Sequence, residues 1–308
     1  MQAVRIYLYG GREVLRLEDA PMPTPTGDDV LVRVVAAGVN PVDWKIREGY
    51  LKTMLPHALP LTLGWDLSGV VAALGPQASG FKVGDAVYSR PDIARDGSYA
   101  EYIVVRAGEL APKPATIAHA TAASLPLAGI TAWEAIVGQG RVTAGQRVLV
   151  HAGAGGVGSL AIQLAKWRGA HVVATASAAN RELVLSLGAD EVIDYRETSF
   201  EQAVGELDLV FDTMGGEVQE RSWQTLKPGG LLVSIVSPPA EARDGRRGAF
   251  IFIGPDAAVL RELGALVDRG VLRPVVGAEF ALADVAAAHA LSESGRARGK
   301  IVLHVGLP

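Results

Sequence analysis

The sequence predicts an α/β fold in two parts, a strand-rich region followed by a doubly wound parallel sheet. Short apolar segments separated by turn residues fill residues 1–123, which is typical of a partly open barrel. From residue 147 onward, strand-like and helix-like segments alternate, and this alternation predicts parallel strands joined by helices. The chain has 308 residues, of which 49% are hydrophobic and 20% are charged, so it can form two domains with buried cores.

The segment 147–181 predicts a strand, a glycine-rich turn, a helix and a second strand in succession. The first strand, Val148–Val150, is apolar and mostly β-branched. Three glycines of the turn have the spacing G-x-G-x-x-G, which permits a tight turn, close approach of backbone to a pyrophosphate, and packing of helix on strand. We therefore expect a dinucleotide to bind here, with its pyrophosphate at the N-terminus of the following helix. The turn residues expected to bind it are Gly153, Gly155, Gly156, Val157 and Gly158.

Six strands are expected in the strand-rich region. Their ranges are 4–8, 14–18, 30–37, 68–74, 86–89 and 99–105. The segment 40–63 is expected to be a loop, and it is long enough to be functional. Two segments of helical composition follow, 118–125 and 131–137, and are expected to be broken by Pro126 and Gly129.

The later elements continue the alternation. Further strands are expected at 171–175, 192–195, 208–212 and 231–236, with helices at 160–167, 180–187, 217–226 and 256–269. The polar segment 238–248 is expected to be a mobile loop. The last elements, a strand at 275–280, a helix at 282–292 and a strand at 300–305, are expected to return to the first domain. The predicted domains are 1–123 with 275–308, and 124–274.

Composition excludes several classes of function. The formal net charge of −4 argues against a general nucleic-acid partner or an anionic membrane surface. No apolar run reaches the roughly 18 residues of a membrane span, and the first residues lack the features of a signal peptide, so we expect a cytoplasmic protein. The absence of cysteine excludes disulfides, thiol catalysis and thiolate metal sites, and the six histidines lack the spacing of metal ligands.

Seven sequence blocks, taken in order, indicate a family. They are AAGVNPVDWKIREG (36–49), GWDLSGVV (64–71), VGDAVY (83–88), GSYAEY (97–102), PLAGITAWEAI (126–136), HAGAGGVGSLAIQLAK (151–166) and RGKIVLHV (298–305). Together they resemble the medium-chain dehydrogenase/reductase superfamily, and within it the zinc-independent, zeta-crystallin-like quinone oxidoreductase branch. The resemblance implies a GroES-like catalytic domain from both ends of the chain, a Rossmann domain between them, and an active-site cleft where the two meet. It also implies a homodimer paired through the edge of the Rossmann sheet, at the strand near Val275–Phe280.

The sequence departs from the zinc-dependent members of this superfamily. Those members carry Cys where Asn40 stands and His where Trp65 stands. The lobe that holds a structural zinc ion with four cysteines is absent as well. The resemblance therefore implies chemistry without a metal ion.

The end of the second strand of the nucleotide-binding unit indicates the cofactor. NAD sites of this fold carry Asp or Glu there, which accepts hydrogen bonds from the ribose 2′-hydroxyl. Here the segment is Thr175-Ala-Ser177, so no carboxylate at that position repels a 2′-phosphate. Ser177 can donate a hydrogen bond, and Arg181 and Tyr195 stand where NADPH-binding relatives carry a basic residue and a tyrosine, so NADPH is the expected cofactor. The alternative is that Arg181 is a solvated residue at a helix start and Tyr195 a packing residue.

Candidate pocket residues come from the segment 40–63 and from the helix before the nucleotide-binding unit. They are Asn40, Asp43, Tyr50 and Thr131. In enoyl-reductase relatives a tyrosine shortly after this motif is the proposed proton donor, and Tyr50 lies one residue off that spacing. The alternatives are that Tyr50 is a surface aromatic residue and that Asn40 and Asp43 bond the local backbone. The resemblance also places backbone groups against the nicotinamide carboxamide, near Ile235, Val236, Phe250 and Phe252.

The resemblance implies reduction of a quinone or an activated C=C bond, such as that of an enone, by hydride transfer from NADPH. For this reaction the protein holds the nicotinamide, keeps the pocket dry and stabilises charge on the acceptor oxygen, while the cofactor carries the hydride. Two alternatives stay open. One is an enoyl-thioester reductase, which needs a larger, positively charged cleft mouth. The other is a non-catalytic NADPH-binding protein that senses redox state or has a structural role.

Overall fold

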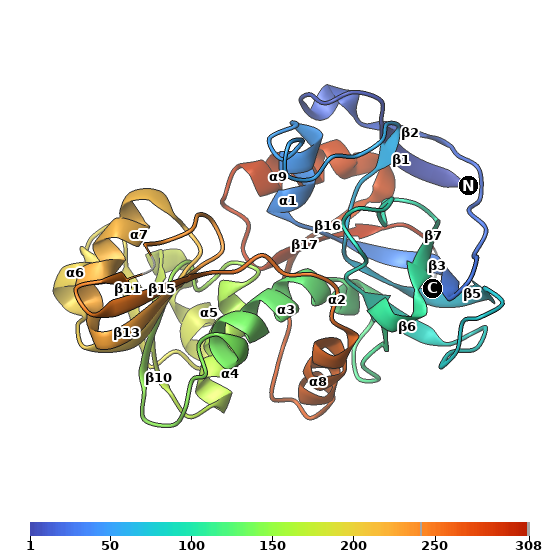
Figure 1. The fold of residues 1–308 in the computed structure, drawn as a ribbon. Helices are drawn as coiled ribbons and strands as arrows, with labels where there is room; N and C mark the ends of the chain where they lie inside the picture. The colour runs from blue at the N-terminus through green and yellow to red at the C-terminus, as the bar shows by residue number, and fades with distance from the viewer. Residues whose placement is uncertain (241, 307–308) are drawn as a thin grey trace. The chain divides into compact units, whose positions relative to one another are not determined.

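The computed structural model describes residues 1–240 and 242–306 (Figure 1). The chain forms two compact units. The first unit contains 1–127, 254–269 and the tail from residue 274, and the second contains 128–253 and 270–273. Across the described residues, no helix is both long enough and apolar enough to cross a membrane.

The first unit is built on two sheets. The larger has the strand order β16-β17-β3-β5-β6-β8, with β7 also paired to β3, and the smaller has the order β2-β1-β4. Strands β16 and β17 run parallel, and the other pairs run antiparallel. The strands are β1 (Gln2–Ile6), β2 (Arg16–Asp19), β3 (Asp29–Val39), β4 (Leu61–Thr62), β5 (Leu67–Leu74), β6 (Ala86–Ser89), β7 (Tyr102–Arg106), β8 (Leu110–Pro112), β16 (Val276–Ala281) and β17 (Lys300–His304).

Short helices lie between these strands along the chain. Those of the first unit are η1 (Arg12–Val14), α1 (Pro41–Arg47), η2 (Ala107–Glu109), α2 (His119–Ala123), α8 (Ala257–Asp268), η6 (Leu282–Asp284) and α9 (Val285–Glu293). The prediction of a loop over 40–63 is wrong at its start, where α1 forms. Pro41 is tolerated in a first helical turn, and Asp43 Oδ2 accepts the backbone N–H of Asn40 at 2.8 Å, so local signals start this helix.

The predicted break between the two helical segments is present, but it lies earlier and is shorter than expected: α2 ends at Ala123, and residues 124–125 separate it from the next helix. Pro126 begins α3 (Pro126–Trp133), because proline at a first helical position gives up an N–H that needs no helical partner. Gly129 lies inside that helix, where a glycine weakens the helix without ending it. A π-helical turn, η3 (Glu134–Gly138), continues the helix beyond Trp133.

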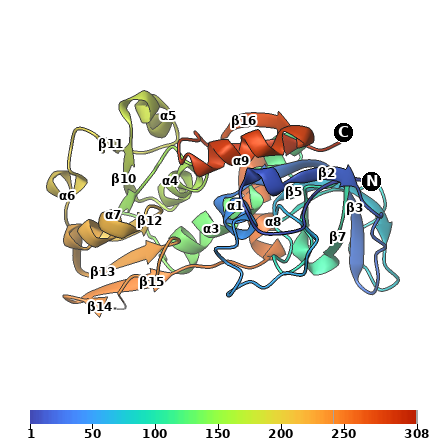
Figure 2. The same cartoon turned by 90° about the horizontal axis from the view of Figure 1, so that it is seen from above.

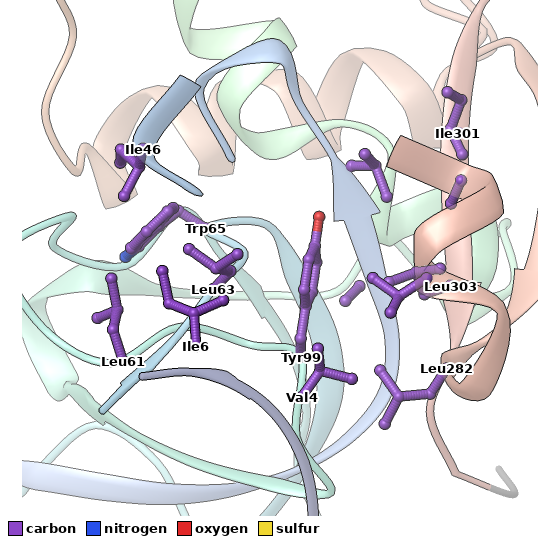
Figure 3. Close-up of a cluster of buried hydrophobic side chains, with 14 of the residues drawn as sticks. Val4, Ile6, Ile46, Leu61, Leu63, Trp65, Tyr99, Leu282, Ile301 and Leu303 are labelled. Atoms are coloured by element: carbon purple, nitrogen blue, oxygen red, sulfur yellow. The ribbon is translucent and has the colours of Figure 1, made fainter. Parts of the chain in front are cut away.

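The core of the first unit joins the two ends of the chain (Figure 3). Ile6 of β1 and Leu303 of β17 belong to one buried cluster. Trp65 and Tyr99 are fully buried in the same cluster, and Ile46 of α1 lies beside the indole of Trp65. Helix α1 is therefore packed against this apolar core.

A seven-stranded sheet forms the centre of the second unit. Its order is β11-β10-β9-β12-β13-β15-β14, in which the first six strands run parallel and β14 runs antiparallel (Figure 2). The order reverses between β9 and β12, which makes this the Rossmann arrangement and confirms the predicted doubly wound sheet. The strands are β9 (Arg147–Val150), β10 (His171–Ala176), β11 (Glu191–Asp194), β12 (Leu207–Asp212), β13 (Leu226–Ser234), β14 (Ala242–Arg243) and β15 (Arg246–Phe250).

Short helices connect the parallel strands. They are α4 (Gly158–Trp167), η4 (Ala178–Asn180), α5 (Arg181–Ser186), α6 (Phe200–Ala203), α7 (Gly216–Ser222) and η5 (Trp223–Thr225). Gly169 follows α4 with a φ of +83°, the left-handed conformation that commonly terminates a helix. Leu149, Val210 and Leu232, from three strands of the sheet, share one buried cluster.

The expectation of a mobile loop at 238–248 is wrong for its described residues. They include an antiparallel hairpin in which Arg243 pairs with Arg246. Asp244 and Gly245 form the turn with φ values of +51° and +74°, and Asp-Gly is a strong signal for a two-residue hairpin turn. The polar composition that suggested a loop is that of an exposed edge strand.

Two further segments differ from expectation. Helix α8, expected in the nucleotide-binding domain, belongs to the first unit, where the Tyr88 hydroxyl donates to Leu260 O and Asp268 Oδ1 accepts the backbone N–H of Thr116 at 2.9 Å. Strand β16 lies at the edge of the first unit's sheet. The edges of the Rossmann sheet, among the described strands, are β11 and β14. The prediction that the Rossmann sheet pairs through the strand near Val275–Phe280 is therefore wrong, because that strand belongs to the other sheet.

Candidate active site

The glycine-rich turn follows β9 and leads into α4. A Cβ on Gly153 would meet a side chain of β10 at 2.9 Å, and a Cβ on Gly158 would meet Ala152 O at 2.3 Å, so packing requires glycine at both positions. Within 4 Å, a Cβ on Gly155 would meet one described atom, Ala152 O at 3.2 Å. The space beside Gly155 is thus otherwise open, as close approach of a pyrophosphate to the backbone requires. The remaining turn residues are Gly156 and Val157.

A buried polar chain supports this turn, and the sequence analysis missed it. His151 Nδ1 lies 3.2 Å from Thr175 Oγ1, and its Nε2 lies 3.0 Å from Ser222 Oγ. Burial lowers the pKa of His151 to about 4, so at neutral pH the imidazole has one donor and one acceptor nitrogen for these contacts. Thr175 Oγ1 also accepts the backbone N–H of Ala152 at 3.1 Å. These hydrogen bonds hold Ala152 at a φ of +50°, a strained conformation for a residue with a Cβ.

Two of the residues expected at a 2′-phosphate lie at the carboxyl ends of adjacent strands. Ala176 of β10 pairs with Asp194 of β11, so Ser177 and Tyr195 follow the two strands at the same carboxyl end of the sheet. Ser177 is 8% exposed and the Tyr195 side chain is 56% exposed. The sequence analysis missed the carboxylate of Asp194, whose Oδ2 accepts the backbone N–H of Ala178 at 2.7 Å. One acidic group therefore lies beside the expected phosphate position, although none stands at residue 177 itself.

Two arginines lie close in sequence to these residues. Arg181 begins α5, and its Nη1 donates to Val192 O at 2.7 Å, which uses one of the five N–H donors of a guanidinium group. The guanidinium of Arg196 lies 5.6 Å from the centroid of the Tyr195 ring, in a cation–π contact. Sequence reasoning missed Arg196, because it follows the strand in a stretch with no motif. Arg181 and Arg196 are thus two cationic side chains close in sequence to Ser177 and Tyr195.

Apolar side chains mark the carboxyl ends of the next strands. Ile235 is half-buried, and Val236, Phe250 and Phe252 are exposed. Between them and the glycine-rich turn, β12 ends at Asp212, whose buried Oδ1 accepts the backbone N–H groups of Met214 and Gly215, each at 2.9 Å. The structure thus places the four residues expected near the nicotinamide on the side of the sheet where such folds bind ligands.

Asn40 lies at the start of α1 and is buried in a polar cluster. Its Nδ2 donates to Asp66 Oδ2 at 2.8 Å, and its Oδ1 accepts from Lys300 Nζ. Lys300 Nζ also lies 3.2 Å from Asp66 Oδ2. Burial raises the pKa of Asp66, and the charge of Lys300 opposes that shift. The sequence analysis missed this ion pair, although a lysine at the start of the apolar strand KIVLH signals that a buried ammonium group needs partners.

Asp43 is fully buried three residues after Asn40. Its Oδ2 accepts from the Tyr99 hydroxyl at 2.7 Å and from the backbone N–H of Asn40 at 2.8 Å. Its Oδ1 is buried and makes no hydrogen bond with the part of the chain that the structure describes. Burial raises the pKa of Asp43 to about 7, while Tyr99 and Lys300 act to lower it. A substantial fraction of Asp43 is therefore protonated at neutral pH.

The other two candidate pocket residues differ in their exposure. Tyr50 is 69% exposed, and the centroid of its ring lies 6.1 Å from that of Trp44 in an edge-on contact. Thr131 is a buried residue of α3 in the second unit. The structure thus brings Asn40 and Asp43 together and leaves Tyr50 at the surface of the first unit.

The residues at the expected zinc-ligand positions do not fit a metal ion. Trp65 is directed into the core, and its indole Nε1 donates to Arg95 O at 3.1 Å. The Oδ1 of Asn40 is bonded to the ammonium group of Lys300. Over residues 1–240 and 242–306, no three His, Asp or Glu side chains form a group that could hold a metal, and the sequence has no cysteine. The usual ligand set of zinc is missing from this position.

A cavity of about 450 Å³ lies in another part of the first unit. Residues of β1, of the connector after β2 and of the segment 95–97 line it. Two arginines in its wall are already paired, Arg5 with Glu18 at 3.4 Å and Arg95 with Asp29 at 3.0 Å. We assign no ligand to this cavity.

Two family models match the chain. The model described as "Alcohol dehydrogenase GroES-like domain" matches residues 26–115, and the model described as "Zinc-binding dehydrogenase" matches residues 187–303. The first match lies in the strand-rich unit, and the second covers much of the Rossmann sheet and the tail. The matches confirm the predicted combination of a GroES-like domain with a Rossmann domain.

Individual proteins match along nearly the whole chain. The 2-methylene-furan-3-one reductase of Solanum lycopersicum is 39% identical, with 96% of this chain and 77% of that protein covered. The chloroplastic NADPH-dependent alkenal/one oxidoreductase of Arabidopsis thaliana is also 39% identical, with the same coverage. Among solved structures, the quinone oxidoreductase from Coxiella burnetii superposes with a TM-score of 0.92 at 36% identity, with 99% of each chain covered. The chain therefore belongs to the medium-chain dehydrogenase/reductase superfamily, in its quinone oxidoreductase branch.

Proposed function

We propose that this protein reduces a quinone or an activated C=C bond, such as that of an enone, by hydride transfer from NADPH and without zinc. One observation carries the proposal: the sheet of the second unit has an open glycine-rich turn beside a strand end with Ser177 in place of a carboxylate. The names of the relatives support it, since they include an NADPH-dependent alkenal/one oxidoreductase and a quinone oxidoreductase.

The residues of the second unit would bind the cofactor, which supplies the hydride when bound. Backbone N–H groups of the turn 153–158 would hold the pyrophosphate. Ser177, Arg181 and Tyr195 would hold the 2′-phosphate, because charged and hydroxyl donors form strong hydrogen bonds with it. The apolar residues expected to exclude water around the nicotinamide are Ile235, Val236, Phe250 and Phe252.

The pocket residues would divide into two groups. The side chains of Asn40 and Asp43 are engaged in buried hydrogen bonds, so their proposed role is to fix the start of α1 beside the substrate. Tyr50 is the proposed proton donor to the reduced substrate, and its exposure lets water compete for that role. Thr131 is proposed as a further polar group of the pocket.

Zinc independence is part of the same proposal. Trp65 and Asn40 occupy the positions of two zinc ligands and are both committed to other contacts. Charge that develops on the acceptor oxygen would then be stabilised by hydrogen-bond donors rather than by a metal ion.

Steady-state oxidation of NADPH against a panel of quinones, enones and enoyl thioesters tests the proposed function. We expect turnover with a quinone or an enone. Turnover with enoyl thioesters alone would favour an acyl-thioester reductase, and NADPH binding without turnover of any substrate would favour a non-catalytic role. A protein that does not bind NADPH would contradict all three.

A pair of glycine variants links this activity to the turn. Gly158→Ala is expected to lose NADPH binding, because its Cβ would meet Ala152 O at 2.3 Å. Gly108→Ala is the matched control, since a Cβ on Gly108 meets no described atom within 4 Å. Equal NADPH affinity in the two variants would contradict the assignment of the turn.

The cytoplasmic location and the homodimer stay predictions. The structure assigns the exposed edges of the Rossmann sheet to β11 and β14 among the described strands, so these are the edges through which that sheet could pair. Light scattering at micromolar protein concentration measures the assembly, and a monomeric mass would contradict the homodimer.

A further inference from the structure

A buried ammonium group lies where β17 meets the start of α1. The Lys300 side chain is 6% exposed, and its Nζ contacts three oxygen acceptors. These are Val39 O at 3.2 Å, Asp66 Oδ2 at 3.2 Å, and Asn40 Oδ1. A lysine ammonium group has three N–H donors, so all of them are satisfied.

The backbone builds this site. Ile301 of β17 pairs with Val39 of β3, which places Lys300 beside the last residues of β3. Gly38 lets Asp66 come close, since a Cβ at this glycine would meet Asp66 Oδ2 at 2.9 Å. Asp66 Oδ1 in turn accepts the backbone N–H of Leu127 at 2.6 Å, so the carboxylate also contacts the first turn of α3.

The hydrogen bonds of Lys300 fix the orientation of the Asn40 amide. An ammonium group can only donate, so its partner on Asn40 must be the amide oxygen. The amide nitrogen then faces Asp66 Oδ2, which can only accept from it. With Lys300 removed, the buried Asp66 carboxylate has lost its counter-charge and is expected to take up a proton. A protonated carboxyl group can donate as well as accept, so the cluster no longer requires that orientation of the amide.

We propose that Lys300 is a positioning residue of the active site: its buried ammonium group, rather than a metal ion, balances Asp66 and sets the orientation of Asn40 at the start of α1. This inference rests on the proposed function, because it treats Asn40 as part of the substrate pocket. It assigns the role to a residue of the C-terminal strand that lies 260 positions from Asn40 along the chain.

Two variants separate positioning from stability. Lys300→Met removes the charge and leaves Asp66 buried without its ion-pair partner, so we expect the melting temperature to fall by roughly 10 °C. In the double variant Lys300→Met/Asp66→Asn neither charge remains. The new amide at position 66 can keep the bond to Leu127 N–H with its oxygen, and its NH₂ group then faces Asn40. Asn40 can satisfy that NH₂ group only by turning its own amide round, so stability recovers while the orientation of Asn40 is reversed.

The measurement is thermal unfolding together with kcat for NADPH-dependent reduction of the best substrate of the panel. We expect kcat to fall by about tenfold to a hundredfold in Lys300→Met, and to stay low in the double variant although its melting temperature recovers. The dissociation constant for NADPH is expected to stay unchanged in both variants. Lys166→Met is the matched control, because Lys166 forms an exposed ion pair with Asp190 at 2.5 Å, and both readouts are expected to match wild type.

The results distinguish a positioning role of Lys300 from a purely structural one. A folded Lys300→Met variant with wild-type kcat would overturn the inference, and so would a double variant in which kcat recovers together with stability, since that is the behaviour of a purely structural ion pair. Where Lys300→Met does not fold, the double variant alone decides between the same two results. A wild-type protein that reduces no quinone or enone would overturn the proposed function and this inference with it, whereas an active wild type with active variants overturns the inference alone.

Discussion

Replacing Ser177 with Asp is expected to change the cofactor preference from NADPH to NADH. A carboxylate at the end of β10 would repel a 2′-phosphate, and it could accept hydrogen bonds from the ribose hydroxyls of NADH. The phosphate contacts that it removes involve charge-assisted hydrogen bonds, each worth roughly 1.5–3 kcal/mol, or about tenfold to a hundredfold in affinity. The structure adds to the effect, because Asp194 already lies beside this position and a second carboxylate would increase the negative charge. The Michaelis constants for NADPH and NADH, measured on the same preparations, check this.

The matched variant Arg181→Ala distinguishes binding of the 2′-phosphate from binding of the rest of the cofactor. It is expected to raise the Michaelis constant for NADPH and to leave that for NADH nearly unchanged, since NADH has no 2′-phosphate. The effect is expected to be smaller than that of Ser177→Asp, because Arg181 shares its guanidinium with Val192 O and Arg196 stays in place. A wild-type preference for NADH, or an equal loss of both cofactors in Arg181→Ala, would show that these residues do not bind the phosphate.

Replacing Asp43 with Ala is expected to lower the free energy of unfolding by roughly 3–5 kcal/mol, because it leaves two buried donors without their acceptor. These donors are the Tyr99 hydroxyl and the backbone N–H of Asn40, and the second bond also caps α1. Urea unfolding of the wild type and the variant measures the difference. A loss below about 1 kcal/mol would mean that water replaces these bonds and that the cluster is more open than the structure shows.

Tyr99→Phe provides the control for this variant. On its own it removes the hydroxyl donor and leaves Asp43 with its bond to the Asn40 N–H. The double variant Asp43→Ala/Tyr99→Phe is expected to lose less stability than the sum of the single variants, because it leaves no unpaired phenol. Additive losses would contradict a direct bond between the two side chains.

The raised pKa of Asp43 leads us to expect that the stability of the protein depends on pH. Burial raises its pKa in the folded protein to about 7, above its usual value of 3.8, so the folded state holds a proton that the unfolded state loses. The contribution to stability is fully present below pH 3.8 and is lost as the pH rises through about 7. An Asp43→Asn variant does not titrate there, so its stability relative to the wild type is expected to increase from pH 5 to pH 8.

Sequence reasoning succeeded where a pattern is local. Hydrophobic character and glycine spacing predict a strand, a glycine-rich turn and a helix at 147–167. The structure contains them as β9, the turn and α4. The predicted strand 86–89 has the same bounds as β6 in the structure. Counting along the second strand likewise places Ser177 near its end, and in the structure Ser177 directly follows β10.

The parts that could not be predicted depend on contacts between distant segments. Lys300 and Asn40 meet only because β17 pairs with β3, and no local pattern reveals that pairing. Asp194 lies beside Ser177 through the register of β10 and β11. The polar residues at 238–248 predict a loop, whereas the structure has an edge hairpin there. Composition does not distinguish the two, because an exposed edge hairpin is as polar as a loop.

The central claim, reduction by NADPH without a metal ion, is tested most directly by assaying protein that has been dialysed against a chelator. NADPH oxidation with the best quinone or enone is measured before and after dialysis, and the metal content of the same samples is determined by elemental analysis. We predict an unchanged rate and far less than one zinc ion per chain. Stoichiometric zinc, with activity that disappears on its removal and returns on its addition, would contradict the account.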